Sequence, residues 1–336
     1  MKRMYLGFPI LGIFSLVFSV CSCSTGEAAA QILGTSSQAP VFLACKAVSG
    51  TEIDFLFSLP VTVVSLNFNP PVEIQSIEEG DVVRVSFAGE MPPGEKLTAD
   101  LLAMDEKGNT INVLVPFRTR NDRIPRLLIN ELRTEYSKPK AEFIELKILD
   151  AGNLAAVKVF IAGNSKEPLV YEFSSVEVSA NEYILLHLRT MEDANCDEYG
   201  ADKDASGGAD AVAGVRDFWV PGTVKLLRKT DAVYLVDQDD NVLDAIMMAD
   251  SQDTWWNKDY LAGTAELLFE KGAWKSADGK IAGPKDSAYS FDIKTAMTRS
   301  LSRDESVPDS NSAADWYVTA TSGISPGKPN NPARFQ

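Results

Sequence analysis

The chain has 336 residues, 45% of them apolar, and its 47 acidic against 32 basic side chains give a formal net charge of −15. This length is typical of two or three domains, and this apolar fraction is enough for packed cores, which excludes a wholly disordered chain. A surface with this acid excess would be repelled by a phosphate backbone, so no nucleic-acid partner is expected.

The N-terminus has the organisation of an export signal. Lys2 and Arg3 precede an apolar stretch that runs from Tyr5 to Val20. The stretch is short for a membrane span, which needs roughly 20 apolar residues, and it fits the apolar region of a secretory peptide. We therefore expect an exported protein.

The apolar stretch ends in Val20-Cys21-Ser22-Cys23-Ser24. A small residue directly before a cysteine resembles the lipobox of bacterial lipoproteins, and Ser22-Cys23 fits that pattern better than Val20-Cys21. The resemblance implies a signal peptide over residues 1–22, acylation of Cys23 with fatty acids such as palmitate, and an acylated tether over residues 23–38. The expected partner is then the lipid bilayer of a bacterial cell envelope, at the periplasmic or surface face of an outer membrane. An ordinary secretory peptide with two incidental cysteines is the alternative.

Residues 39–122 carry a strand pattern of period two. Apolar residues alternate at 41–47 and 53–57 around a Ser49-Gly50 turn, which predicts a half-buried hairpin with Val41 and Leu43 on its buried face. Further strands are predicted at 82–87, 97–104 and 111–117, and a Gly-Asn turn separates the last two. About seven short strands over roughly 80 residues are typical of a β-sandwich.

Two pieces of this first domain resemble bacterial immunoglobulin-like domains. They are T-E-I-D-F-L-F-S-L-P-V at residues 51–61 and D-E-K-G-N at residues 105–109. Domains of that family act mainly as spacers, so the resemblance implies an architecture and no ligand. Residues 118–125 then form a short linker that ends in Pro125, which indicates limited freedom between the domains.

A second domain opens with LLINELRTEYSKPKAEFIEL at residues 127–146. Leu127 and Ile129 share one side of a first short strand, Lys138-Pro139-Lys140 makes a turn, and Phe143 begins the return strand. I-N-E, a polar gap and then E-F-I-E-L resembles the opening of the lamin tail domain, an immunoglobulin-like β-sandwich.

The lamin tail resemblance continues in chain order from about residue 126 to 330. The segments that carry it match an early apolar segment, a Gly-x-Tyr strand, a late hairpin and a closing signature, at residues 154–159, 181–186, 230–244, and 300–303 with Trp316 and 325–330. The departure from the family is Ala156-Val157 in place of Gly-Trp, which removes a large aromatic residue from the core. The resulting fold class is all-β, with two immunoglobulin-like β-sandwiches in series.

Two insertions interrupt the second domain, at about residues 190–222 and 249–297. The first is acidic and rich in small residues, and the second has an apolar patch at 261–269, stopped near Gly272, that predicts a short helix. Long insertions in loops cost little stability and often carry function. The two remaining cysteines, Cys45 and Cys196, lie in different domains, and isolated cysteines are usually buried apolar residues, so no disulfide is predicted.

The acidic insertion contains one candidate metal loop. Asp202, Asp204, Ser206, Gly207 and Asp210 match D-x-D-x-S-G-x-x-D, and alternating oxygen ligands with a glycine at the turn suit Ca²⁺. Position twelve is an alanine where an EF-hand has a bidentate glutamate, so only a looser calcium loop remains. A solvated acidic loop without a metal is the alternative.

The second insertion is rich in aromatic residues. Trp255, Trp256, Tyr260 and Trp274 could form a stacking surface for the sugar rings of a glycan, because aromatic faces are broad and rigid. The alternative is that these side chains pack a small core of their own against the sandwich, since large aromatics mostly bury themselves.

Motifs of common enzymes are absent from the sequence. His187 is the only histidine and lies in a strand-like run, where a structural role is more common than a catalytic one. There is no H-E-x-x-H, no G-K-[ST] phosphate loop and no G-x-G-x-x-G. Glu131, Glu142 and Glu145 are interpreted as strand and turn residues, although hydrolysis by paired acids stays open.

We therefore expect a lipid-anchored envelope protein that is not an enzyme and needs no cofactor, calcium apart. Its predicted function is binding or scaffolding of a protein or glycan ligand through the lamin-tail-like domain. One alternative is a carbohydrate-binding or enzyme-accessory surface module that uses the tryptophan insertion. A second is a hydrolase with an unrecognised carboxylate site. The scaffold prediction places the sharpest surface features in the groove between the domains.

Overall fold

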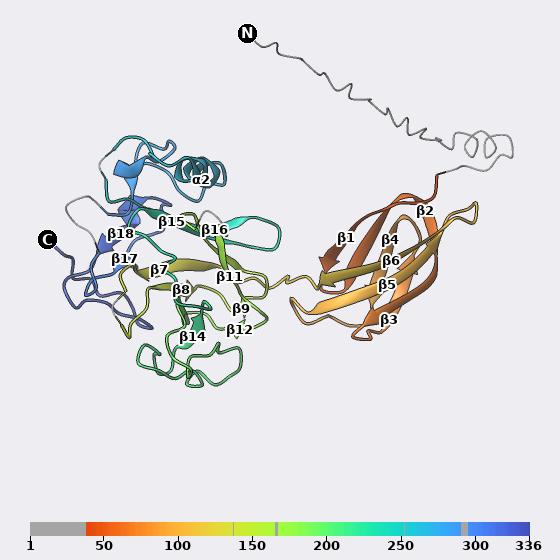
Figure 1. Ribbon diagram of the computed structural model, residues 1–336, viewed down its shortest axis with the longest axis horizontal. Coiled ribbons are helices and arrows are strands. Elements are labelled where there is room, and N and C mark those ends of the chain that lie inside the picture. The colour runs from red at the N-terminus through yellow and green to blue at the C-terminus, as the bar shows by residue number, and fades with distance from the viewer. Residues whose placement is uncertain (1–37, 137, 165–166, 252, 290–294) are drawn as a thin grey trace, which may run out of the picture.

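The computed structural model describes residues 38–336 except 137, 165–166, 252 and 290–294. The predicted signal peptide, Cys23 and all but the last residue of the tether lie outside the described residues. Within the described residues the strands form two groups, β1–β6 and β7–β18, which Figure 1 shows as two bodies in series. Each group has its own buried hydrophobic cluster. The prediction of all-β sandwich domains in series is confirmed.

The first domain consists of β1 (Phe42–Ser49), β2 (Glu52–Asn69), β3 (Ile74–Glu78), β4 (Gly80–Phe87), β5 (Lys96–Met104) and β6 (Thr110–Arg118). The strand β2 is 18 residues long and serves two sheets. Its first part pairs with β1 and β4, and its second part pairs with β5, which in turn pairs with β6. Six strands therefore form this domain, where the sequence predicted about seven short ones, and the long strand β2 belongs to both sheets.

The predicted burial of β1 is wrong at its start. Val41 is 55% exposed and Leu43 is 60% exposed, whereas Phe42 packs edge to face on Phe57 at a ring distance of 5.7 Å. The pairing of β1 with β2 shifts register between Phe42 and Ala44. A one-residue shift exchanges the two faces of a strand, so the simple alternation fails here. On β2, Ile53, Phe55 and Phe57 are buried as predicted.

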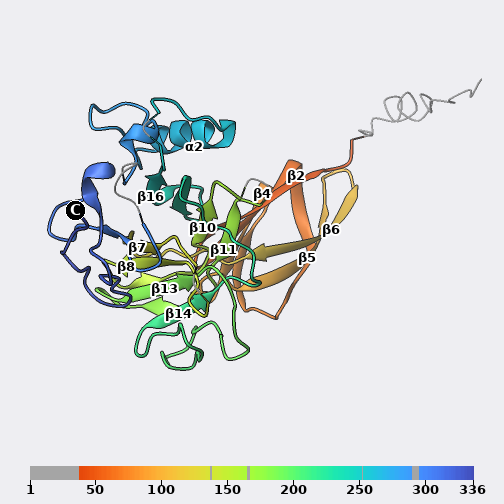
Figure 2. The ribbon, with the colours of Figure 1, turned by 60° about the vertical axis from the view of Figure 1, so that its left-hand side comes forward.

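The second domain holds twelve strands among its described residues, β7 (Leu127–Arg133), β8 (Phe143–Ile148), β9 (Gly152–Asn153), β10 (Lys158–Ile161), β11 (Leu169–Glu172), β12 (Glu177–Val178), β13 (Tyr183–His187), β14 (Arg216–Trp219), β15 (Asp231–Val236), β16 (Val242–Met248), β17 (Leu301–Arg303) and β18 (Trp316–Val318). One sheet has the order β14-β13-β8-β7-β17-β18 and a second has the order β11-β10-β15-β16, with β12 and β9 paired separately. The hydrophobic cluster takes residues from both large sheets, so the core lies between these two layers (Figure 2).

The predicted hairpins of this domain are confirmed. Strands β7 and β8 are antiparallel, and so are β15 and β16. The helix predicted in the second insertion is α2 (Asp259–Glu270), and its buried residues Leu261, Ala265 and Leu268 follow the spacing of one helix face. That face packs against β15 and β16. Two short 3₁₀ turns complete the domain, η1 (Pro284–Asp286) and η2 (Ala313–Asp315).

The acidic insertion joins the sandwich through β14, which pairs in parallel with β13. Its carboxylates accept hydrogen bonds from backbone N–H groups of the same insertion. Glu192 accepts from Ala209 at 2.8 Å, and Glu198 accepts from Ser206 at 2.8 Å and Asp217 at 2.7 Å. The acidic side chains that suggested a solvated loop therefore serve as hydrogen-bond acceptors for the backbone of the insertion. No helix among the described residues is long and apolar enough to cross a membrane.

Candidate functional site

The two domains meet at a short segment that both of them bind. Asn121 is 2% exposed, and its side-chain amide donates hydrogen bonds to the carbonyls of Asn153 at 2.8 Å and Ala155 at 2.9 Å. The side chain of Gln238 accepts from the Asn121 N–H at 3.0 Å and donates to the Asn121 carbonyl at 2.9 Å. The end of the first domain is thus hydrogen-bonded into the second.

Ion pairs and close packing flank this contact. Arg120 donates to Asp239 of the second domain and to Asp122 beside it. The Asp122 carboxylate also accepts from the Gly50 N–H in the first domain at 2.8 Å. Gly94 approaches Ala155 so closely that a Cβ at position 94 would lie 2.7 Å from the Ala155 methyl group. These contacts dock the two sandwiches against each other.

A groove of about 370 Å³ follows this junction. We call it the junction groove, and its charged lining consists of Lys46, Arg118, Arg120, Lys158, Glu172 and Asp239. The hydrogen bond from Arg120 holds the pKa of Asp239 below its usual range, and Lys46 adds to this effect. The half-buried Cys45 also lines the groove, and burial raises the pKa of its thiol to about 12, so it is not a reactive thiolate at neutral pH. Cys45 and Cys196 are both free thiols.

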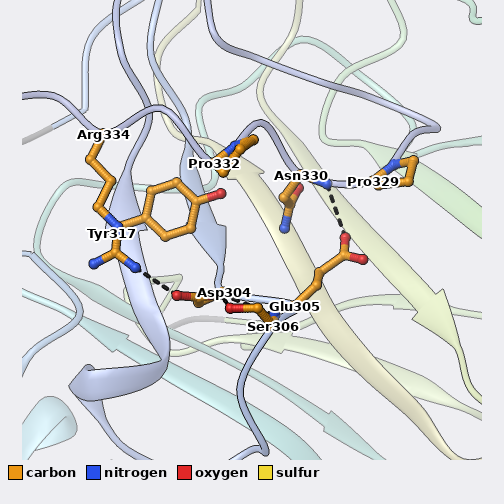
Figure 3. A pocket seen from close by; sticks show the side chains of 8 residues that line it. All are labelled: Asp304, Glu305, Ser306, Tyr317, Pro329, Asn330, Pro332 and Arg334. Atoms are coloured by element: carbon orange, nitrogen blue, oxygen red, sulfur yellow. Dashed lines mark hydrogen bonds and ion pairs between the residues drawn. The ribbon is translucent and has the colours of Figure 1, made fainter.

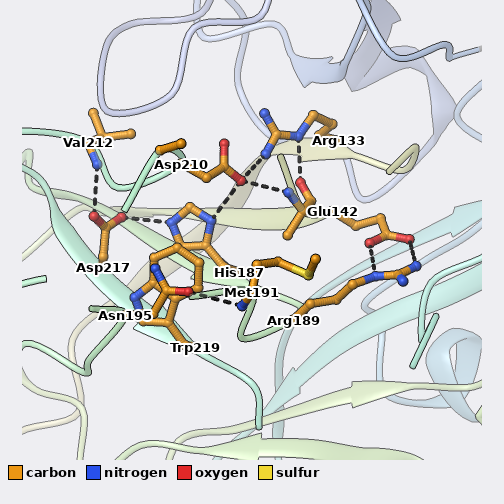
Figure 4. Close-up of polar contacts among 12 residues, drawn as sticks. Arg133, Glu142, His187, Arg189, Met191, Asn195, Asp210, Val212, Asp217 and Trp219 are labelled. Atoms are coloured by element: carbon orange, nitrogen blue, oxygen red, sulfur yellow. Dashed lines mark hydrogen bonds and ion pairs between the residues drawn. The ribbon is translucent and has the colours of Figure 1, made fainter. Parts of the chain in front are cut away.

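A second polar cluster centres on His187, which is 1% exposed (Figure 4). Its Nε2 lies 2.9 Å from Asp217 Oδ1, and its Nδ1 lies 3.5 Å from Asp210 Oδ2, a distance suited to an ion pair and long for a hydrogen bond. Trp219 stacks on the imidazole with ring centres 3.8 Å apart. Burial alone would lower the pKa of His187, but the two carboxylates outweigh it and raise that pKa. The histidine is therefore enclosed, and its partners hold the acidic insertion to β13.

A third cluster of buried acids binds the closing signature at residues 325–330, which we call the closing segment. Glu131 accepts from the Ser325 N–H at 3.1 Å, and Glu145 accepts from the Gly327 N–H at 2.6 Å. Glu305 accepts from the Asn330 N–H at 3.0 Å. Burial raises the pKa of Glu131 and, together with the neighbouring Glu131 charge, raises that of Glu145 well above its ordinary value. These acids serve as backbone acceptors under the closing segment.

A depression of about 490 Å³ lies beside the closing segment (Figure 3). Its wall includes Asp304, Glu305, Tyr317, Asn330 and Arg334. Arg334 binds Asp304 at 2.6 Å, and Lys147 and Tyr183 bind Glu305 from behind. Both carboxylates nearest this depression are thus engaged with cations of the protein itself.

The predicted calcium residues each bind different partners within the protein. Asp202 and Asp204 lie on the exposed part of the insertion, where their carboxylates accept from backbone N–H groups of Asp204 at 3.0 Å and Gly214 at 2.7 Å. Ser206 accepts from the Trp219 indole at 2.9 Å, and Asp210 binds His187 and Arg133. In the described part of the chain, no group of three or more His, Cys, Asp or Glu residues is arranged to hold a metal ion. The calcium loop stays a prediction.

The four predicted glycan-stacking residues also differ in exposure. Trp255 is 83% exposed, whereas Trp274 is 1% exposed. Trp256 and Tyr260 are half-buried and pack against the core, and the Trp256 indole donates to the Ala282 carbonyl at 2.9 Å. Of this set, Trp255 alone presents most of its ring to a ligand.

Comparison with known proteins places the second domain in a family. Residues 125–318, more than half of the chain, match the family described as the TP_1001 protein second domain. The chain belongs to the TP_1001 second-domain family. A relative from Treponema pallidum (strain Nichols), described as an uncharacterized protein, is 27% identical over 255 residues, which are 71% of this chain and 63% of that relative. The chain thus spans less than two thirds of that relative's length.

A solved structure, the N-terminal part of the bacterial S-layer protein SbsC, aligns with 67% of this chain and 46% of its own. It has 11% identity and a TM-score of 0.25, which is too distant to bear on the fold. The TP_1001 second-domain match includes the His187 cluster and all three acids that bind the closing segment. It excludes the first domain and the closing segment itself. Sequence reasoning missed Asn121, Arg120 and Gln238, because each is an ordinary polar loop residue whose role depends on contacts more than 110 positions away.

Proposed function

We propose that this chain is an envelope-anchored lipoprotein that acts as a non-catalytic binding or scaffolding module. Acylated Cys23 would hold it to the bilayer, the first sandwich would serve as a spacer, and the lamin-tail-like second domain would present the binding surfaces. More than one acyl chain gives stable anchoring, which a single chain does not.

The observation that carries this proposal is the docking of the two sandwiches through Asn121. A buried amide with both of its donor hydrogens used fixes a geometry, because breaking it leaves buried polar groups unsatisfied. The first described residues lie at the end of the first domain away from the junction (Figure 1). This arrangement suits a spacer that sets the second domain at a defined orientation away from the anchored end.

The state of the carboxylates supports a non-catalytic role. Glu131, Glu145 and Glu305 are occupied as acceptors for the closing segment, and the His187 imidazole is enclosed between two aspartates and a tryptophan ring. A general acid or base needs access to the proton that it transfers. These groups stabilise the fold and leave the exposed surfaces for binding.

Anchoring is tested by detergent phase partition and mass spectrometry of the protein made in a bacterial host that acylates lipoproteins. The wild type should enter the detergent phase and carry acyl mass, and Cys23→Ser should lose both. The matched control Cys21→Ser should keep both. Acyl mass that survives Cys23→Ser would overturn the assignment of the anchor.

A carbohydrate-binding role is the second candidate, and the exposure of Trp255 is the observation that favours it. Trp255→Ala should then abolish retention on the glycan that the wild type binds in a glycan array. Leu114→Ala, which removes another exposed apolar side chain, from the first domain, should not change it. An array without any bound glycan would remove this candidate.

A further inference from the structure

The junction groove has walls from both domains. Lys46 lies on β1 of the first domain, and Lys158 lies on β10 of the second. Small side chains, Cys45, Ala47 and Ala156, line the space between the charged groups. Because they are short, they leave a volume of about 370 Å³, within the range of small-molecule sites.

The charge of the groove is opposite to that of the chain. Acidic side chains outnumber basic ones by 47 to 32 overall, yet four cations and two carboxylates line the groove. Arg120 is paired with Asp239 and Asp122, and Arg118 lies 3.8 Å from Glu172. Lys46 and Lys158 form no ion pair with any residue that the structure describes. The lining residues carry a net excess of two positive charges, which Asp122 beside Arg120 reduces to one. The unpaired cations are the flexible ammonium groups of Lys46 and Lys158.

We infer that the junction groove binds a small ligand that carries a phosphate group. A phosphate monoester has a charge of about −1.5 to −2 at pH 7, which matches the excess on the lining. Lysines bind phosphate as mobile point charges, so Lys46 and Lys158 can close on it from opposite walls. Arg118, which makes only a long contact with Glu172, supplies a third donor. Arg120 is fixed by its two aspartates and holds the junction rather than the ligand.

This inference rests on the proposed function, because the two lysines face one groove only while the domains are docked. The phosphate could belong to a soluble ester or to a lipid headgroup, and both present the same chemistry. The test therefore includes a soluble probe and a membrane probe.

The experiment titrates the purified full chain in detergent with inorganic phosphate by isothermal calorimetry, with sodium chloride of equal ionic strength as the reference. The test variant is Lys46→Gln with Lys158→Gln. The control is Lys225→Gln with Lys275→Gln, which removes the same charge from two exposed lysines outside the groove. In a parallel sedimentation assay without detergent, chains that also carry Cys23→Ser, and so have no acyl anchor, are mixed with vesicles that contain phosphatidic acid.

The wild type and the control should bind phosphate, and the test variant should bind about tenfold more weakly or worse, because charge-assisted hydrogen bonds are lost. Vesicle binding that falls in the same variant would identify a lipid headgroup as the source. Absence of phosphate binding, or an equal loss in the control, would overturn the inference. If the double variant melts early, the single variant Lys46→Gln, whose side chain is exposed, gives the same comparison.

Small-angle scattering of the same samples separates the two proposals. A compact, single-shaped particle without phosphate binding would reject the groove and keep the docked scaffold. A flexible, extended particle would reject the docked scaffold itself.

Discussion

Glu131 on β7 and Glu145 on β8 stand directly opposite each other across the hairpin, and both are buried. Each accepts a backbone N–H from the closing segment, so the pair ties the C-terminal loop to the hairpin that opens the second domain. The charge of Glu131 disfavours ionisation of Glu145, and burial also raises the pKa of Glu145. Ionisation of this buried pair therefore lowers the stability of the folded protein as the pH rises.

Glu145→Gln should stabilise the protein at neutral pH. The pKa of Glu145 is raised above its unfolded value, so its contribution to stability falls as the pH rises from about 4.5 through the folded pKa. Glutamine stays neutral and can accept from Gly327. The Asn130 amide donates to Glu145 Oε1 at 2.9 Å, so it must rotate before its Oδ1, which has no partner among the described residues, can accept from the new amide. Thermal melts should show an advantage of a few degrees near pH 8 that shrinks toward pH 4.

Glu305→Gln is the matched control for this change. Lys147, Asn330 and Asn130 outweigh burial and lower the pKa of Glu305, so its contribution is present above the unfolded pKa and is lost as the pH falls. This variant should be less stable than the wild type at pH 8. Destabilisation of Glu145→Gln at pH 8 to the same extent as Glu305→Gln would contradict the account of the buried pair.

His187 should change stability with pH in the same sense as Glu145, although its stabilising form is the charged one. Its pKa in the folded protein is raised above 6.5, so its ion pairs stabilise the fold fully below that value and weaken as the pH rises through the folded pKa. Imidazole resonances in nitrogen-detected NMR should titrate with a midpoint above 6.5. A midpoint below 6.5 would refute this assignment.

Loss of His187 should loosen the acidic insertion first. His187→Ala leaves Asp217 buried without its cation and should cost about 3–5 kcal/mol, in the range for a broken buried pair. Hydrogen exchange should rise in residues 190–222 more than in β15 and β16. Uniform exchange over the whole domain would argue against a local role.

Ala156→Gly should stabilise the protein. Ala156 has a φ of +64°, a left-handed conformation that suits glycine and strains a residue with a Cβ. Relief of this strain should raise the free energy of unfolding by about 1 kcal/mol in denaturant titrations.

The contrasting control is Ala262→Gly in α2. Glycine in a helix interior costs about 1 kcal/mol relative to alanine, so this variant should be less stable than the wild type. Equal destabilisation by both substitutions would mean that the backbone at residue 156 does not favour glycine.

Arg303→Met should be among the most destabilising single changes. Arg303 donates to Asp244 at 2.7 Å and to the Ile129 carbonyl at 2.8 Å, so it links strands of both sheets. Burial raises the pKa of Asp244 to about 6 even with this partner. Loss of the arginine should cost about 3–5 kcal/mol at pH 8, where Asp244 is ionised, and less at pH 5, where it is protonated. Urea titrations at the two pH values measure this difference.

Arg334→Met is the surface counterpart. Its pair with Asp304 is half-exposed, and such pairs contribute under about 1 kcal/mol. A loss as large as that of Arg303→Met would show that burial does not decide the strength of these pairs.

Sequence patterns over a few residues predicted the elements whose formation depends on neighbouring residues. The β7–β8 and β15–β16 hairpins and helix α2 follow from apolar period and turn residues, and all three are present. Strand β14 was not predicted, because all four of its residues are buried, without alternation, and its partner β13 is reached only across the insertion. The register shift at Leu43, between Phe42 and Ala44, likewise depends on the pairing of β1 with β2 and not on the residues themselves.

Candidate sites were harder to predict for the same reason. The D-x-D-x-S-G-x-x-D spacing drew attention to Asp210, yet its cation in the structure is Arg133, 77 positions earlier in the chain. The junction groove has no sequence motif, since its lysines come from two domains and are joined only by the docking at Asn121. Contacts between residues far apart in the sequence form both the Asp210 ion pair and the junction groove.

The central claim is that the two sandwiches form one docked unit. Distances between spin labels, measured by double electron–electron resonance, test it most directly. Spin labels would be placed at Leu114→Cys and Val224→Cys, both exposed, in a chain whose native cysteines are replaced by serine. One narrow distance distribution is predicted, and it should broaden when Asn121→Ala is added. A broad distribution without that change would show that the domains move independently and would contradict the account.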